Sequence, residues 1–226
     1  MQIALLEHDS ITIKQNDKSI KLYRIISTKA INIRIPVPNK INVLHEWTNV
    51  FIEKHTIGGY VESLDHLEGN SWVEGNAKVW GNAKVTNAVI VDQAKIFGNA
   101  AVSNSYLSGY ATIFDNAVVD DSWIADLAIV KGHANVTSTK MFNSAMVFGN
   151  AIVKNSLLTD GVYIIKDAKV TNCILKDTAM IGGTAEVTGC TMSNQSYFTE
   201  GIHTAKNIDI SADLNSVIPF AFYDLI

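Results

Sequence analysis

A repeat of fixed length governs more than half of this 226-residue chain. From Ala77 to Gln195, seven segments of 17 residues follow one another without an insertion or a deletion. A short and constant period is the signature of a solenoid, in which stacked repeats build a core that no single repeat could form. The repeat therefore predicts an architecture, and it says little about chemistry.

Aliphatic residues recur within each repeat at steps of six, five and six, which neither a helix nor a simple strand would produce. A small residue follows each first aliphatic residue by four positions. The second aliphatic column contains only valine and the small column only alanine: Val85, Val102, Val119, Val136, Val153, Val170 and Val187, with Ala83, Ala100, Ala117, Ala134, Ala151, Ala168 and Ala185. Large and small residues alternating in this way suit the narrow interior of a three-sided β-coil.

This spacing is close to the hexapeptide pattern of left-handed β-helices, with one corner of every coil shortened by one residue. We therefore predict an all-β fold, a left-handed parallel β-helix of seven regular coils. At about 4.8 Å per coil its length is about 34 Å. Polar ladders mark two corners, because Asn and Asp tolerate left-handed backbone angles: Asn82, Asn99, Asn116, His133, Asn150, Asp167 and Thr184, and Asn87, Asn104, Asp121, Ser138, Asn155 and Asn172.

Three segments follow from where the period starts and stops. Residues 1–59 form an N-terminal β-rich cap, residues 60–195 the β-helix and residues 196–226 a C-terminal capping segment. Within the first segment we expect strands at Ile11–Lys14 and Ile20–Ile26, joined by a turn that contains Asn16 and Asp17. Caps are expected because the ends of a solenoid expose unpaired strand edges.

The chain shows no sign of export or of membrane insertion. The start MQIALLEHDS lacks a basic region, a long apolar run and a cleavage site, and no segment has the length of a membrane span. We expect a cytoplasmic protein.

Two cysteines, Cys173 and Cys190, lie 17 residues apart in one small inward column. A redox pair or half of a metal site is one interpretation. The other is that they are small buried fillers, since the same column contains Ala88, Ser105, Ser122, Thr139 and Ser156. The second is preferred, and no metal site is predicted.

Charge argues against several partners. Between Ala77 and Gln195 there are nine Lys, no Arg and nine acidic residues, so the coils carry neither a basic nor an acidic stripe. We therefore expect no nucleic-acid partner and no membrane partner. Ice binding is disfavoured too, because Ser103, Asp120 and Lys154 interrupt the threonine column of the second face.

Aromatic residues gather in the outward columns of two faces. Soluble monomers seldom expose large apolar patches, so these columns are expected to be covered, either by sister subunits or by the terminal segments. Alternatively, aromatic ladders simply stabilise neighbouring strands. We predict a homo-oligomer, a dimer or trimer, or a complex with a protein partner. The candidate interface residues are Trp80, Phe97, Phe114, Phe148, Ile165, Tyr106 and Trp123.

The segment that leads into the coils resembles the YdcK-type hexapeptide-repeat proteins of bacteria and their phages. The resemblance rests on Leu22-Tyr23-Arg24-Ile25, on Gly58-Gly59-Tyr60-Val61-Glu62-Ser63, on Glu68-Gly69-Asn70-Ser71-Trp72-Val73 and on the GNAKV run from Gly75 to Val79. It extends from about Leu22 to Gln195. Members of that family are usually labelled acyltransferases, by analogy with trimeric hexapeptide acyltransferases. Such a label is an inference from the fold.

The histidines of the chain give a way to assess the acyltransferase hypothesis. Enzymes of that kind resemble one another in using a histidine base near a cleft between subunits, often beneath an extruded loop. The coils contain one histidine, His133, and no extruded loop. It is the best single candidate for a catalytic residue, although a corner His in an Asn ladder is more often a neutral substitution. One coil histidine cannot supply the three zinc ligands of γ-class carbonic anhydrases.

We therefore expect a non-enzymatic or catalytically degenerate β-helix that acts through its surface, without a cofactor. The alternative is an acyltransferase that uses acetyl-CoA or another acyl-CoA as co-substrate. A third hypothesis, suggested only by the occurrence of the resembling family in phages, is an inhibitor of a host protein.

Overall fold

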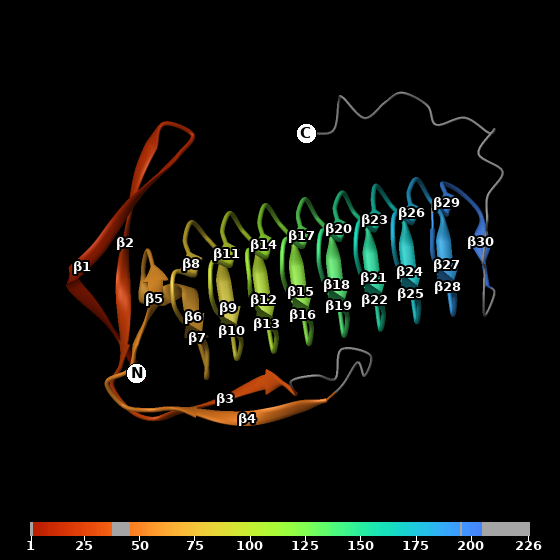
Figure 1. Ribbon diagram of the computed structural model, residues 1–226. Coiled ribbons are helices and arrows are strands. Elements are labelled where there is room, and N and C mark those ends of the chain that lie inside the picture. The colour runs from red at the N-terminus through yellow and green to blue at the C-terminus, as the bar shows by residue number, and fades with distance from the viewer. Residues whose placement is uncertain (1, 38–45, 195, 205–226) are drawn as a thin grey trace.

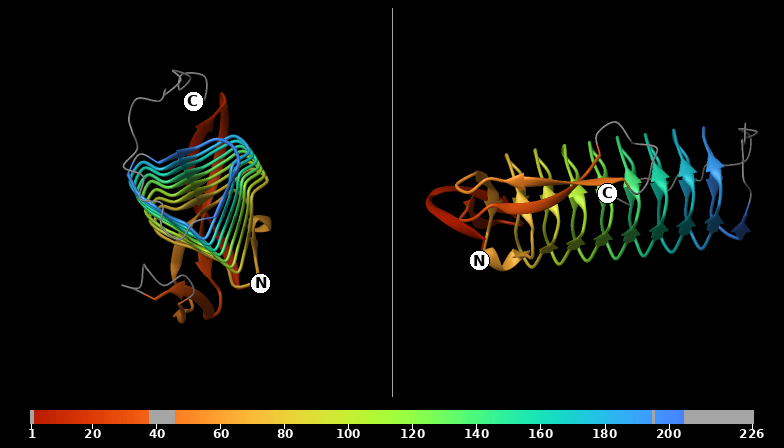
Figure 2. Two further views of the ribbon diagram at one scale, coloured as in Figure 1. Left: turned by 90° about the vertical axis from the view of Figure 1, so that its right-hand side faces the viewer. Right: turned by 90° about the horizontal axis from the view of Figure 1, so that it is seen from below.

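The computed structural model describes residues 2–37, 46–194 and 196–204. Within these residues, three parallel sheets wind into a triangular prism, which Figure 2 shows end-on in its left view. Each coil adds one short strand to each sheet in turn, and the coils stack along the axis seen in Figure 1. The chain is a left-handed parallel β-helix, so the predicted fold class is confirmed.

The strands of the coils fall into three sheets that follow each other along the chain. Sheet 1 contains β5 (Ile57–Val61), β8 (Lys78–Val79), β11 (Lys95–Ile96), β14 (Thr112–Ile113), β17 (Ile129–Val130), β20 (Met146–Val147), β23 (Tyr163–Ile164), β26 (Met180–Ile181) and β29 (Tyr197–Phe198). Sheet 2 contains β6 (Leu67–Glu68), β9 (Lys84–Thr86), β12 (Ala101–Ser103), β15 (Val118–Asp120), β18 (Asn135–Thr137), β21 (Ile152–Lys154), β24 (Lys169–Thr171), β27 (Glu186–Thr188) and β30 (Ile202–His203). Sheet 3 contains β7 (Trp72–Val73), β10 (Val89–Ile90), β13 (Tyr106–Leu107), β16 (Trp123–Ile124), β19 (Lys140–Met141), β22 (Leu157–Leu158), β25 (Ile174–Leu175) and β28 (Thr191–Met192).

The core follows the predicted columns. Neighbouring coils pair in register, so that Val85, Val102 and Val119 lie side by side. Every aliphatic side chain of the three inward columns is at most 1 % exposed, and the alanine column is fully buried. The first coil differs, because Val61 pairs with Val79 at a spacing one residue longer than in later coils. The shortened coil of 17 residues is thus a property of the repeats that follow the first coil.

Each coil of the repeat turns three corners, and each corner contains one residue with positive φ. Between sheets 2 and 3 this residue belongs to the predicted polar ladder, as at Asn87 with φ 50°. Between sheets 1 and 2 the residue with positive φ precedes the predicted ladder residue, as Gly81 precedes Asn82. The ladder residues there bond to each other instead, and Asn82 Nδ2 donates to Asn99 Oδ1 at 3.0 Å. The repeat pattern did not single out the third corner, where Asp92 has φ 62°.

The shortened corner between sheets 2 and 3 contains a ladder of side-chain hydrogen bonds. Its members are Ser105, Ser122, Thr139, Ser156, Cys173 and Cys190, all buried. Ser122 Oγ donates to the Asp120 carbonyl at 2.7 Å and accepts from the Thr139 N–H at 3.1 Å. The pattern continues as far as Cys173 Sγ, which accepts from the Cys190 N–H at 3.4 Å. These residues are therefore buried, as expected, and also supply acceptors to backbone N–H groups. Both cysteines are free thiols.

The N-terminal hairpin extends sheet 1 and closes its end. Strands β1 (Ile3–Gln15) and β2 (Lys18–Ser27) pair antiparallel, and β2 pairs antiparallel with β5. The turn between them has positive φ at Asn16 and Asp17, as the sequence predicts. Two glycines allow the close packing where β5 enters the coils, since a Cβ on Gly58 would lie 2.5 Å from the Val73 carbonyl oxygen.

A second hairpin lies lengthwise along the coils, as Figure 1 and the right view of Figure 2 show. It consists of β3 (Ile31–Pro36) and β4 (Trp47–Ile52), paired antiparallel, and is called the strap below. Ile31 and Ile33 are buried in the main core cluster together with Trp72 and Val89 on the outer side of sheet 3. The short 3₁₀ helix η1 (Leu64–His66) occupies a corner of the first coil.

Parallel pairing continues beyond Gln195, where the sequence period ends. Strand β29 pairs with β26, and β30 pairs with β27. Residues 205–226 of the predicted C-terminal cap lie outside the described residues. The described part of the chain contains no helix with the length and hydropathy of a membrane span.

Candidate interaction surface

The N-terminal hairpin covers the first of the predicted interface residues. Trp80 is 6 % exposed and forms a cluster with Leu22 and Tyr60, against which side chains of β1 and β2 pack. Its indole Nε1 donates to Gln15 Oε1 at 2.5 Å. Coverage of Trp80 therefore comes from a terminal segment of the same chain, one of the two alternatives left open by the sequence.

A stack of flat side chains extends from Trp80 along the outer side of sheet 1. Phe97 stacks on Trp80 with ring centroids 4.5 Å apart, and Phe114 stacks on Phe97 at 4.9 Å. In the next coil the Lys131 Nζ lies 5.9 Å from the Phe114 ring centroid and 5.2 Å from that of Phe148. A cation over two aromatic faces is attracted by both rings, so this break in the aromatic column is itself stabilising.

A second outward column of sheet 1 continues the apolar surface beside this stack. The two columns together form a surface, called the platform below, over the coils that follow Phe97. Its residues are Phe114, Ile129, Lys131, Met146, Phe148, Tyr163, Ile165, Met180 and Tyr197. All are partly exposed except Tyr197, which is exposed at 50 %. Within the described residues, neither hairpin packs on these side chains.

Sheet 3 presents the other predicted interface residues, and the strap lies over its first strands. Tyr106 packs against the core cluster that contains Ile31 and Ile33 of the strap. Trp123 lies edge-on to Phe142 at 5.0 Å, in a small cluster with Ala125 and Leu157. These aromatic residues are therefore packed within the chain, and their role in contacts with another subunit stays a prediction.

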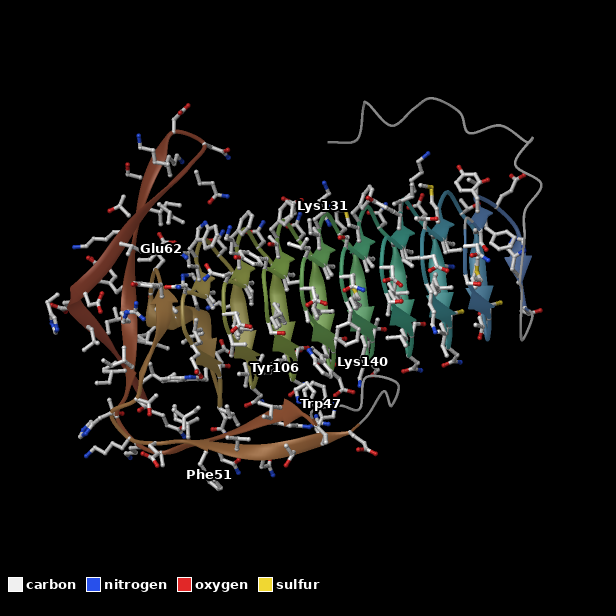
Figure 3. The ribbon with its side chains drawn as sticks, in the orientation of Figure 1. Trp47, Phe51, Glu62, Tyr106, Lys131 and Lys140 are labelled. Atoms are coloured by element: carbon white, nitrogen blue, oxygen red, sulfur yellow. The ribbon has the colours of Figure 1, made fainter. Side chains whose placement is uncertain are left out.

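Lys140 is the one buried cation in this region of the described structure. It is 3 % exposed, and its Nζ lies 5.0 Å from the Trp123 ring centroid. Burial lowers the pKa of Lys140, and the negative charge of Glu46, the residue before β4, opposes that shift. Figure 3 shows Lys140 and Tyr106 at the edge of the coils nearest the strap, and Lys131 at the opposite edge. Lys140 thus lies on sheet 3 close to the strap.

Sheet 2 has a largely polar outer side, in which Ala101, Val118 and Ile152 are apolar exceptions. Lys169 Nζ forms an ion pair with Glu186 Oε1 at 2.6 Å, and Ser103 Oγ donates to Asp120 Oδ1 at 2.6 Å. Both contacts join equivalent positions of neighbouring coils. The three outer sides therefore differ, and the platform is the apolar side that the described chain leaves open.

Among the residues that the structure describes, no side chain orients His133 as a base. His133 is exposed at its corner, and within the described residues only its backbone N–H is bonded, to the Gly149 carbonyl at 2.7 Å. A catalytic base is normally held by a hydrogen bond to a third group. In the residues that the structure describes, no three potential ligands gather into a metal site.

Two features of the surface were not among the predicted site residues. The 17-residue period places the column Ile129, Met146, Tyr163 and Met180 on the outer side of sheet 1, but none of these residues was named as a candidate interface residue. Lys140 occupies a position of the aromatic column on sheet 3, and its burial beside the Trp123 ring has no counterpart in the repeat.

Fold and surface together define a class, a left-handed parallel β-helix with an apolar outer side that the described residues leave open. Residues 114–203 match the family model described as GlmU-like, C-terminal hexapeptide. This match includes the coils that carry the platform, and it supports the hexapeptide-repeat interpretation of the sequence. The comparison with curated proteins found no match.

Proposed function

We propose that this protein is a non-catalytic β-helix that works by binding another protein chain on its platform. The observation that carries the proposal is the contrast between the outer sides of the coils. The hairpin covers Trp80, the strap covers Trp72, and the described chain leaves the apolar residues from Phe114 to Tyr197 open. Surfaces of this kind mark sites of protein interaction.

A second copy of the chain is the occupant that we propose first. The platform is flat, and its side chains repeat at the spacing of the coils, about 4.8 Å. Two such surfaces can therefore interleave their side chains along their whole length. Lys131 sets one condition, because two ammonium groups placed opposite each other would repel, so the two copies must be offset or antiparallel.

The more specific expectations from the sequence are part of the same proposal. The resemblance to YdcK-type proteins of bacteria and phages, the cytoplasmic location and the inhibition of a host protein are all compatible with a surface that binds protein. The alternative function is an acyl-CoA-dependent acyltransferase, supported by the GlmU-like match over residues 114–203. The exposed and unoriented His133 speaks against it.

Light scattering tests the proposal directly. We expect the wild-type protein to have a mass that is a multiple of 24.7 kDa. Phe148→Lys should lower that mass while the protein stays folded, because a desolvated lysine at the centre of an apolar interface is costly. The matched control is Ile152→Lys, four residues away on the outer side of sheet 2, which is largely polar, and it should leave the mass unchanged. A wild type that is monomeric at high concentration contradicts self-association.

The acyltransferase alternative has its own test. If the chain binds acetyl-CoA, a thermal shift assay should show stabilisation that grows with ligand concentration. We expect no shift. A saturable shift that His133→Asn reduces would favour the enzyme.

A further inference from the structure

A polar groove runs between the strap and the corner that joins sheets 2 and 3. Its volume is about 160 Å³, and its lining is Asn32, Arg34, Asn49, Asn70, Asn87 and Asn104. Five of these six side chains are carboxamides. The groove lies away from the platform, because Asn70, Asn87 and Asn104 come from the corner after sheet 2 in the first three coils.

Hydrogen bonds fix the orientations of two of the three carboxamides on the wall formed by the coils. Asn87 Oδ1 accepts from the Asn70 N–H at 3.0 Å, which leaves the Nδ2 of Asn87 as a free donor. Asn104 Nδ2 donates to Asp120 Oδ1 at 2.9 Å, which leaves the Oδ1 of Asn104 as an acceptor. Neither amide can be flipped without losing its partner, because an N–H needs an acceptor and a carboxylate needs a donor. A donor and an acceptor are thus presented on adjacent coils.

The wall formed by the strap is anchored by Arg34. Its Nη1 lies 3.3 Å from Asp121 Oδ1, and its guanidinium lies 4.6 Å from the Trp47 ring centroid. Asn49 is the cross-strand partner of Arg34, and Asn32 is two residues away, so all three share one side of the strap. Within the described residues, the side chains of Asn32, Asn49 and Asn70 make no hydrogen bond, and their capacity is open to a ligand.

The lining selects a chemical class. An apolar ligand would strip water from five carboxamides without replacing the lost hydrogen bonds. A phosphate or carboxylate would need a cation as its partner. Arg34 is the single cation of the lining, and it is already paired with Asp121. A carboxamide has both donor and acceptor groups, and a hydroxyl has one donor and two acceptor lone pairs. Neighbouring hydroxyls of one molecule can therefore accept from the amide N–H groups and donate to the amide oxygens. Sugars carry such hydroxyls and no charge.

We propose that this groove binds a neutral saccharide. Asn87 and Asn104 contact it from the coils, and Asn32 and Asn49 contact it from the strap. The site does not depend on the platform, so it can exist whether or not the protein self-associates.

Nuclear magnetic resonance titration is the experiment. The probes are glucose, mannose, galactose, N-acetylglucosamine, cellotetraose and chitotetraose, each added to the full-length protein. We expect at least one to shift the side-chain amide signals of the groove asparagines in a saturable way. The double variant Asn32→Ala with Asn49→Ala should bind that sugar about tenfold more weakly or worse, since each removed amide loses its hydrogen bonds. Asn135→Ala, on the outer side of sheet 2, is the matched control and should bind as the wild type does.

Three results would overturn the proposal. The first is that none of the six sugars shifts the groove amides. The second is that sodium phosphate shifts them and the effect disappears in Arg34→Gln, which would make the groove an anion site. The third is that the blocked peptide acetyl-Gly-Ser-Gly-Ser-amide binds there and the sugars do not. The mass of the double variant, measured by light scattering, shows separately whether the platform still functions.

Discussion

Single residues carry the register of this fold, because adjacent positions in a coil face opposite environments. Val136 is fully buried between Val119 and Val153, whereas Thr137 next to it lies on the outer side of sheet 2 between Asp120 and Lys154. A change of one position along the chain therefore separates core from surface.

The first prediction uses this pair. Val136→Asp should destabilise the protein by at least about 3 kcal/mol, or prevent soluble expression, because its carboxylate would be buried without a partner. Thr137→Asp places the same group in water beside Lys154 and should change stability by less than about 1 kcal/mol. Urea unfolding measures both. Equal stability of the two variants would contradict the observed register.

The second prediction concerns His133, which replaces asparagine in an exposed corner ladder. His133→Asn should leave stability within about 0.5 kcal/mol of the wild type, as for most surface changes. It should also leave the mass in solution unchanged, because the corner lies between sheets 1 and 2 and outside the platform. An asparagine cannot accept a proton near neutral pH, so loss of biological activity at unchanged stability and mass would make His133 a base.

At the scale of elements, the sequence predicts the parts that repeat better than those that do not. The coils can be predicted from columns such as Val85 to Val187, because the residues of a buried column are all apolar and of similar size. The first hairpin follows from its Asn16-Asp17 turn. The strap does not, because the alternation Ile31, Ile33, Ile35 fits any half-buried strand and no local pattern says which face it will cover. Lys140 and the polar groove depend on that docking and were missed with it.

The hydrogen-bonded ladder inside the short corner was only half predicted, for a related reason. Ser, Thr and Cys are small, so their column was interpreted as space filling. The structure shows that Ser122 Oγ also accepts from the Thr139 N–H at 3.1 Å. Side-chain size is visible in a sequence, whereas an unmet backbone N–H is not.

The third prediction separates these two roles. Ser122→Ala keeps the small side chain and removes the acceptor, so a buried N–H at Thr139 loses its partner. We expect a loss of about 1–3 kcal/mol in unfolding free energy. Ser122→Cys, which the chain itself uses at Cys173, should cost less. If Ser122→Ala is neutral by urea unfolding, the ladder contributes nothing beyond filling space.

At the scale of the whole molecule, the β-helix is a one-dimensional stack in which each coil contacts only its neighbours. The specialised parts lie around that stack: the hairpin at one end, the strap along sheet 3 and the platform on sheet 1 (Figure 1). Figure 3 shows Phe51 pointing away from the coils on the outer side of the strap, where it is 68 % exposed. The stack supplies straight, rigid sides, and the non-repeating hairpins make those sides unequal.

The last prediction follows from the stack. Deleting Ala145–Gly161, one complete repeat, should leave a folded β-helix that is one coil shorter, because Ser144 would then lead into Val162 at the same position of the next coil. Every inward column stays inward across the junction, with Val136 beside Val170. Deleting Ala145–Asp160, one residue less, would turn the following inward side chains outward and should prevent soluble folding. Circular dichroism and solubility distinguish the two. A shorter deletion that folds as well as the full repeat would show that the 17-residue period is not what holds the coils together.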